Sequence, residues 1–452
     1  MSTYDLLVRG GTLVTADGLR QADLAMADGR IVTIEPELNG TSREEIDARG
    51  LHVFPGVIDP HVHFNEPGRT AWEGFASGSR ALAAGGTTTF CDMPLNSSPP
   101  TLNREEFTRK QAAAQASSLV DFALWGGLTP TNLAALEELA ECGVIGFKAF
   151  MSNSGLNEFA AVDDLTLYEG MQQAARLGKI VAVHAENEQM TAALARRARA
   201  EGRTGVRDYL NSRPVIAELE AITRAILFAS ETRCSLHIVH VSTGRGVQLV
   251  VDARMRGLDV TCETCPHYLA LTEEDMLQLG AVAKCAPPLR SREDQQSLWQ
   301  HLLAGDIQFV ASDHSPAPPD MKTGSDFFQV WGGISGCQSL LQVLLTDGHE
   351  QRELSLPAIA ALTAAHAAQR FGVADRKGCL AINMDADLVL VDSSHHEVLR
   401  AQDLCYRHQQ SPYIGRMLRG GIVRTLVRGM TIFRDGQPVS SPVGRLLTPT
   451  VG

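Results

Sequence analysis

The feature that most constrains the fold is a series of eight short apolar segments separated by stretches rich in alanine and leucine. Each apolar segment has the length and composition of a buried strand. The candidate strands are residues 53–63, 87–92, 120–128, 144–150, 180–184, 236–240, 260–263 and 307–313. Helical segments fall in the gaps, for example at residues 189–201, 215–229 and 246–256. Strands that alternate with helices over about 320 residues predict an α/β protein built on a closed (β/α)8 TIM barrel. A doubly wound open sheet is the alternative, but no glycine-rich phosphate loop supports it.

Both ends of the chain show a different pattern. Residues 4 to about 54 alternate in polarity and are interrupted by Gly10-Gly11, Asp28-Gly29 and Gly50, which is typical of hairpins. Similar segments return at residues 386–391 and 424–433. Strands from the two ends can satisfy each other's edges, so we expect one small β-sandwich domain, residues 1–54 with 376–452, beside a barrel domain of residues 55–375.

The composition excludes several functions. The net charge is 40 − 52 = −12, which argues against a nucleic-acid partner held by phosphate contacts. No apolar run reaches the roughly 20 residues of a membrane span, and the N-terminus lacks a basic segment followed by an apolar one, so we expect no membrane partner and a cytoplasmic protein. The nine cysteines are interpreted as reduced thiols, including the C-x-x-C pair Cys262 and Cys265.

The chemistry is expected where the predicted strands end. His61 and His63 lie two residues apart at the end of the first barrel strand, so their imidazoles point to the same side. One such pair is a weak signal. In TIM barrels, however, the reactive residues gather at the carboxyl ends of the strands. Four further metal-ligand types, or residues that can become one, occupy such positions: Lys148, His184, His240 and Asp313.

Lys148 is the unusual member of this set, because it lies between Phe147 and Phe150 on a strand without a neighbouring acid. A buried ammonium is costly and would repel a metal ion. Reaction of the neutral amine with carbon dioxide gives a carbamate, which reverses the charge and offers two oxygens that can bridge two metals. The alternative is a lysine that reaches solvent or pairs with a distant acid.

These residues predict a site for two metal ions. We expect His61, His63, Asp313 and one carbamate oxygen to hold the first ion, and His184, His240 and the other oxygen to hold the second. Imidazole and carboxylate ligands suit zinc, with manganese, cobalt or iron as alternatives. Two such ions can share a hydroxide nucleophile near neutral pH. Asp313 would be both ligand and catalytic proton shuttle to the leaving nitrogen.

Other polar residues carry weaker predictions. Asn96 follows the second barrel strand and is a candidate substrate contact. We expect His314 to support the site or the fold, and His267 to serve either loop structure or the pocket wall. His366 and Trp125 are expected in packing.

Together, these residues resemble the cyclic amidohydrolases, the family of allantoinase, dihydropyrimidinase (hydantoinase) and dihydroorotase, over nearly the whole chain. Lys148 falls where the family carries its carboxylated lysine. Four segments are similar to the allantoinases: residues 61–69 with 72–74, then 146–150, 262–268 and 312–316. The resemblance implies hydrolysis of the hydantoin-ring amide of allantoin to allantoate in purine breakdown, and a homotetramer.

Two departures from the sister enzymes bear on the substrate. Dihydroorotases place an arginine two residues after the second histidine to bind the substrate carboxylate, whereas this chain has Asn65 there. Hydantoinases carry a tyrosine shortly after the lysine strand to stabilise the oxyanion, and residues 151–155 contain none. A hydantoinase or dihydropyrimidinase activity remains the main alternative. A non-catalytic assembly protein of the same fold is a remote one, because such relatives are expected to lose ligands and this chain keeps all of them.

Overall fold

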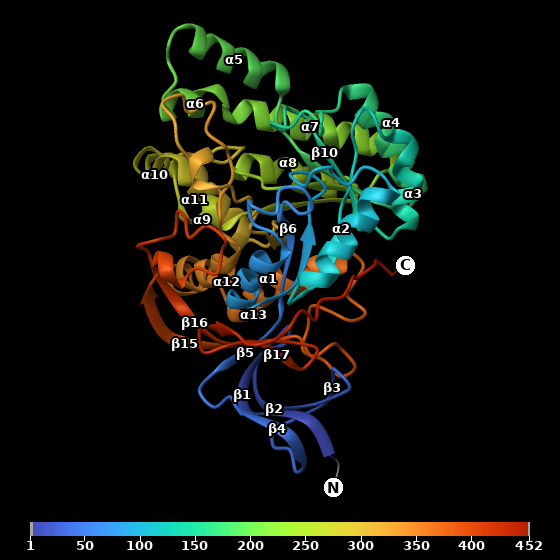
Figure 1. Ribbon diagram of the computed structural model, residues 1–452, viewed down its shortest axis with the longest axis vertical. Helices are drawn as coiled ribbons and strands as arrows, with labels where there is room; N and C mark the ends of the chain where they lie inside the picture. Colours follow the sequence, from blue (N-terminus) through green and yellow to red (C-terminus); the bar gives the residue numbers. More distant parts are fainter. Residues whose placement is uncertain (1–2, 451–452) are drawn as a thin grey trace.

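The computed structural model describes residues 3–450. A barrel surrounded by helices lies above a β-sheet layer in which the blue strands of the N-terminal part run beside the red strands of the C-terminal part (Figure 1). This arrangement confirms the predicted combination of a (β/α)8 barrel with a β-domain made from both ends of the chain.

The barrel wall consists of parallel strands in two hydrogen-bonded groups. Their bounds are β6 Val57–Val62, β7 Thr87–Asp92, β8 Asp121–Leu124, β9 Gly126–Gly127, β10 Gly146–Phe150, β11 Ile180–His184, β12 Leu236–Ile238, β13 Val260–Thr264 and β14 Phe309–Val310. β8 and β9 are two parts of one barrel strand, separated by Trp125. The Ile145 N–H, just before β10, donates to the Leu124 carbonyl at the end of β8 and so links the two groups of strands. A bridge between Val62 and His314 closes the ring between its first and last strands.

The helices cover the outside of the barrel and bury their apolar faces against it. In α7, for example, Ala221, Ile222 and Ala225 are buried. The α-helices are α1 Phe75–Ala84, α2 Arg104–Ser117, α3 Leu136–Glu141, α4 Asp164–Arg176, α5 Glu188–Ala200, α6 Val206–Ser212, α7 Val215–Thr232, α8 Gly244–Met255, α9 Pro266–Ala270, α10 Glu273–Leu279, α11 Arg292–Leu303, α12 Leu340–Val343, α13 Leu356–Ala360 and α14 His366–Arg370.

The terminal strands form one nine-stranded sheet with the order β18-β17-β16-β15-β5-β1-β2-β3, and β4 pairs with β1. Their bounds are β1 Thr3–Thr15, β2 Gly18–Ala27, β3 Arg30–Glu35, β4 Thr41–Asp47, β5 His52–Pro55, β15 Leu388–Val398, β16 Met417–Val427, β17 Met430–Arg434 and β18 Gln437–Pro438. Side chains from both ends share one apolar cluster, in which Leu24 and Ile31 join Leu388 and Leu426. The predicted domain limits at 54/55 and 375/376 stay a prediction.

Three details of the predicted strands are wrong. The segment 53–63 is two strands, because the chain passes from the sheet into the barrel at Gly56, where a Cβ would lie 2.1 Å from the Thr88 hydroxyl. Gly10-Gly11 lies inside β1 at a register shift instead of making a hairpin. The segment 424–433 is divided by a turn at Arg428 and Gly429, both of which have positive φ.

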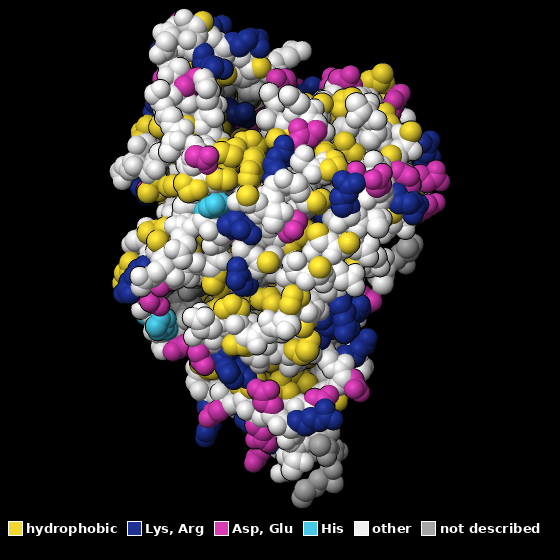
Figure 2. Space-filling model, viewed as in Figure 1, with side chains coloured by type: hydrophobic (Ala, Val, Ile, Leu, Met, Phe, Trp, Pro, Cys, Tyr) yellow, Lys and Arg dark blue, Asp and Glu magenta, His cyan; other side chains and the backbone are white. Residues whose placement is uncertain are grey.

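Charge is spread over the visible face of the molecule, where acidic and basic side chains are interspersed (Figure 2). Within residues 3–450, no helix is both long and apolar enough to span a membrane.

Candidate active site

Six side chains predicted from the strand ends meet at the carboxyl end of the barrel. His61 belongs to β6, Lys148 to β10 and His184 to β11. His63, His240 and Asp313 follow β6, β12 and β14 directly or within three residues. The parallel strands of a barrel end at the same rim, which brings residues more than 250 positions apart in the sequence into one site.

The first group contains His61, His63 and Asp313. The Asp313 carboxylate oxygen Oδ1 lies 3.2 Å from His61 Nε2 and 3.4 Å from His63 Nε2. One ligand atom from each of the three residues fits within 4.8 Å of the others. Burial alone would raise the pKa of Asp313, but the neighbouring imidazoles hold it well below its usual range. The carboxylate is therefore ionised and ready to bind a cation.

The second group contains His184 and His240, whose Nδ1 and Nε2 atoms face each other at 3.0 Å. Burial lowers the pKa of both imidazoles, so both are neutral near pH 7. A neutral imidazole is the form that ligates metal ions, and two ring nitrogens turned toward each other suit a shared cation.

Lys148 completes the site. Its side chain is fully buried, and Nζ has no hydrogen-bond partner within residues 3–450. Burial, opposed by the charges of Glu263 and Asp313, lowers the pKa of Lys148 to about 7. With this pKa a substantial fraction of the amine is neutral at neutral pH, and the neutral amine is the form that reacts with carbon dioxide.

Two carboxylates missed at the sequence level orient the histidines. Glu263 accepts from His61 Nδ1 at 2.5 Å, and its other oxygen lies 3.1 Å from His237 Nε2. Glu186 lies 2.9 Å from His184 Nε2 and also pairs with Arg213. With one ring nitrogen donating to a carboxylate, each of the two site histidines presents its other nitrogen to the centre of the site.

A sequence signal existed for one of these carboxylates. Glu186 lies two residues after His184, the same spacing that links His61 and His63. Glu263 ends a segment predicted as a strand. The sequence gives no reason to pair it with His61, which lies 202 positions away and becomes its neighbour only in the folded barrel.

Three site residues adopt backbone conformations that are unfavourable for side chains other than glycine. The φ angles of Asn96, His240 and Asp313 are +69°, +40° and +45°. Such conformations cost about 1–3 kcal/mol each and gather at functional sites, where the surrounding structure enforces them. His240 and Asp313 lie two and three residues after the ends of β12 and β14, and all three residues line one cavity.

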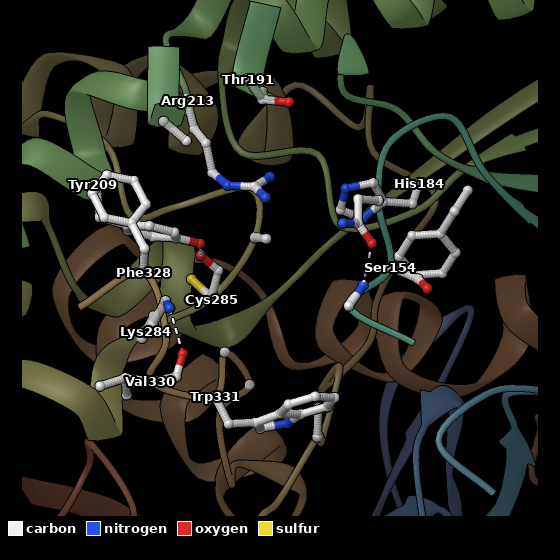
Figure 3. Close-up of a pocket in the computed structure, with 18 of the residues that line it drawn as sticks. Ser154, His184, Thr191, Tyr209, Arg213, Lys284, Cys285, Phe328, Val330 and Trp331 are labelled. Carbon is white, nitrogen blue, oxygen red and sulfur yellow. Dashed lines mark hydrogen bonds between the residues drawn. The ribbon is translucent and has the colours of Figure 1, made fainter. Parts of the chain in front are cut away.

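The site opens into a cavity of about 500 Å³. His184 lies on one side of this cavity, whereas Arg213, Tyr209 and Lys284 lie across from it, and Trp331 forms another part of the wall (Figure 3). A cavity of this size accommodates a small ring with a polar substituent.

The remaining predicted residues lie in different places. Asn96 lines the cavity and its amide donates to the Ser315 hydroxyl at 3.3 Å. Asn65 is buried and donates to the Pro316 carbonyl, and it is absent from the cavity wall.

The two further histidines lie outside the cavity lining. His314 supports the fold, since its Nδ1 accepts from the Gly336 N–H. His267 is buried beside Asp313, behind the wall of the cavity, with no hydrogen-bond partner for either ring nitrogen within residues 3–450.

The two residues expected in packing differ. Trp125 is buried and donates to the Pro60 carbonyl, as expected. The expectation is wrong for His366, which is exposed on α14 and hydrogen-bonds only to the Gln308 carbonyl within residues 3–450. All nine cysteines are free, so Cys262 and Cys265 form no disulfide.

The site geometry can be compared with known proteins. The profile of the Amidohydrolase family matches residues 52–432. The chain belongs to the amidohydrolase family. Among curated amidohydrolases it is 63% identical to the allantoinase of Rubrobacter xylanophilus, with 99% of this chain and 98% of that protein covered. It is 59% identical to the allantoinase of Solibacter usitatus, over 98% of this chain and 97% of that protein.

Solved amidohydrolase structures share the fold along the whole chain. The L-hydantoinase (dihydropyrimidinase) of Arthrobacter aurescens superimposes with a TM-score of 0.96 at 35% identity, covering 98% of this chain and 100% of that one. The dihydropyrimidinase of Brevibacillus agri gives a TM-score of 0.93 at 32% identity, covering 99% of each chain.

Proposed function

We propose that this amidohydrolase is an allantoinase, which hydrolyses the hydantoin-ring amide of allantoin to give allantoate in purine breakdown. The observation that carries the proposal is the 63% identity to a curated allantoinase over almost the full length of both proteins. Similar solved structures of hydantoinases show lower identities, such as 35% and 29%, although their fold is the same.

The donor set supports two divalent metal ions, with zinc as the favoured metal and manganese, cobalt or iron as alternatives. His61, His63 and Asp313 would hold one ion, His184 and His240 the other, and the carboxylated Lys148 would bridge them. The unpartnered, buried Lys148 amine is the strongest support for this bridge. When bound, such ions supply a hydroxide nucleophile at neutral pH and polarise the amide carbonyl.

The residues of the chain supply the rest of the chemistry. Asp313 is ionised and faces the cavity, so it accepts the proton released on attack and passes it to the leaving ring nitrogen. Glu263 and Glu186 keep His61 and His184 in fixed orientations. Asn96 is proposed to contact the substrate from the cavity wall.

The absence of an arginine at position 65 fits a substrate without a carboxylate. Asn65 itself donates to a backbone carbonyl away from the cavity, so it supports the loop while leaving no cation for a carboxylate at that place. We also propose a homotetramer in the cytoplasm, on the basis of the family resemblance and the lack of a membrane-spanning helix in the described part of the chain.

Substrate turnover tests the proposal. The metal-loaded enzyme is expected to hydrolyse allantoin with the highest kcat/KM among allantoin, dihydrouracil and dihydroorotate. A preference for dihydrouracil would instead establish the alternative, a dihydropyrimidinase, which shares the fold. Metal analysis and an intact-mass search for the Lys148 carbamate under non-denaturing conditions test the cofactors separately. Metal-free protein from cells grown with ample zinc and bicarbonate would favour the non-catalytic alternative.

A further inference from the structure

Two lysines, the buried Lys284 and the half-buried Lys322, hold the loop that forms the cavity wall opposite the proposed metal ligands. Lys322 donates from Nζ to the carbonyls of Ala281, Trp331 and Gly333. Lys284 donates from Nζ to the carbonyls of Phe327, at 2.6 Å, and of Val330. Both lysines therefore fix residues 327–333, which contribute much of this wall.

The two lysines differ in what remains of their hydrogen-bonding capacity. An ammonium has three N–H donors. Lys322 uses all three on backbone carbonyls and does not line the cavity. Lys284 uses two and does line the cavity. One N–H of Lys284 is thus left for a ligand.

The surroundings of Lys284 make an additional acceptor favourable. Its side chain is only 4% exposed, and its hydrogen-bond partners within residues 3–450 are two backbone carbonyls, with no carboxylate among them. Rings of Tyr209 and Phe327 lie 4.6 Å and 5.1 Å from Nζ. Burial, together with the positive charges of Arg213 and Lys322, lowers the pKa of Lys284 to about 7. A carbonyl oxygen from a ligand would stabilise the charged form.

The position of Lys284 relates it to the substituent of the substrate. Lys284 lies across the cavity from His184 (Figure 3), so a substrate whose ring amide reaches the metal-ligand residues extends its substituent toward Lys284. Allantoin differs from plain hydantoin by a neutral ureido group, which has a strong carbonyl acceptor. We infer that Lys284 donates a hydrogen bond to the ureido carbonyl of allantoin and determines specificity for ureido-substituted hydantoins. This inference rests on the proposed function.

The test compares two ligands in two variants. Lys284→Met keeps the apolar stem and removes the donors, and Lys322→Met disturbs the same loop without touching the cavity. For each protein, kcat/KM is measured with allantoin, and unsubstituted hydantoin is used as a competing ligand so that its inhibition constant needs no turnover. Thermal melting and metal content verify that each variant is folded and loaded.

Lys284→Met is expected to lower kcat/KM for allantoin about tenfold to a hundredfold, the range for loss of a hydrogen bond from a charged donor. Its inhibition constant for hydantoin should change less than about threefold. Lys284→Arg, which restores donors, should recover part of the loss for allantoin. Lys322→Met should affect allantoin and hydantoin alike.

Two results would overturn the inference: equal weakening of allantoin and hydantoin in Lys284→Met, or the same selective loss in Lys322→Met. Either result would mean that Lys284 only stabilises the loop and does not select the substrate. If Lys284→Met fails to fold, Lys284→Arg decides. Its guanidinium restores only part of the hydrogen bond, so kcat/KM for allantoin should fall while the inhibition constant for hydantoin changes little. Equal weakening of the two ligands in this variant would overturn the inference. Failure of the wild-type enzyme to hydrolyse allantoin refutes the proposed function before any variant is measured.

Discussion

At the scale of single residues, the most consequential group is the Lys148 amine. It is buried and has no hydrogen-bond partner in the described part of the chain, which is unfavourable unless the amine reacts or binds. The same burial makes it reactive, since its pKa of about 7 leaves a large neutral fraction at neutral pH. The cost of the buried lysine and its proposed function thus have one physical origin.

The reloading of metal-free enzyme should depend on this pKa. The pKa is lowered from 10.5 to about 7, so the neutral amine increases as the pH rises through about 7. At constant dissolved carbon dioxide and zinc, the rate at which allantoin turnover returns should increase severalfold between about pH 6 and pH 8. A rate that keeps rising to a midpoint near 10.5 would contradict the assignment.

Lys148→Ala should not recover allantoin turnover when metal is added back, although added short-chain carboxylic acids are expected to restore part of its activity.

Glu186 is expected to act on the metal through His184. Replacing it with alanine removes the acceptor 2.9 Å from His184 Nε2, and loss of such a partner lowers metal affinity about tenfold to a hundredfold. Elemental analysis after dialysis against a weak chelator should find about one ion per chain lost in Glu186→Ala. Glu186→Gln keeps an acceptor oxygen and should retain more of the metal. Full occupancy in both variants would show that Glu186 does not position His184.

At the scale of elements, the strands were predicted in the right order, but several are shorter than expected. The segments 236–240 and 307–313 contain only β12 Leu236–Ile238 and β14 Phe309–Val310. The reason is visible at their ends, where His240 and Asp313 have positive φ and leave the extended conformation. An apolar pattern in the sequence indicates which residues are buried. It does not show where the strand ends, because a functional residue such as His240 is buried although it lies beyond the strand.

The outer helices are expected to depend on their caps. Asn103 precedes α2, and its side chain accepts from the Glu106 N–H at 2.9 Å. Asn103→Ala should lower the free energy of unfolding by about 1 kcal/mol, measured by urea denaturation, with unchanged allantoin turnover because Asn103 does not line the cavity. Asn103→Asp retains a capping oxygen and is the matched control. A loss of similar size in Asn103→Asp would mean that the cap bond is not the cause.

At the scale of the whole molecule, a buried charge cluster joins the barrel to the terminal sheet. Lys377 Nζ lies 2.6 Å from carboxylate oxygens of both Asp121, at the start of β8, and Asp387, next to β15. Arg428, in the turn between β16 and β17, pairs with the same Asp121. The cluster lies at the amino end of the barrel strands, the end associated with stability and opposite the active site.

Removing the central cation of this cluster should destabilise the protein without altering its chemistry. Lys377→Met leaves the three carboxylates that it pairs with, Asp121, Asp385 and Asp387, buried with reduced compensation. Breaking a buried pair in this way costs about 3–5 kcal/mol. Urea denaturation should show this loss, while kcat for allantoin stays near that of the wild type at low temperature. Lys179→Met removes a half-buried lysine that meets only the Val144 carbonyl and should cost much less. Equal losses in the two variants would contradict the role of the cluster.

The sequence by itself determined the class of fold and which six residues are proposed as metal ligands, because each lies in or directly after a recognisable apolar segment and strand ends converge in a barrel. Only the tertiary structure decided how those residues are supported. Glu263 reaches His61 across 202 positions in the sequence, and Lys284 faces the cavity because a loop more than 40 residues later folds over it. Local patterns encode burial and direction along one segment. Hydrogen bonds between distant segments depend on where the closed barrel places those segments, and the sequence of one segment does not contain that information.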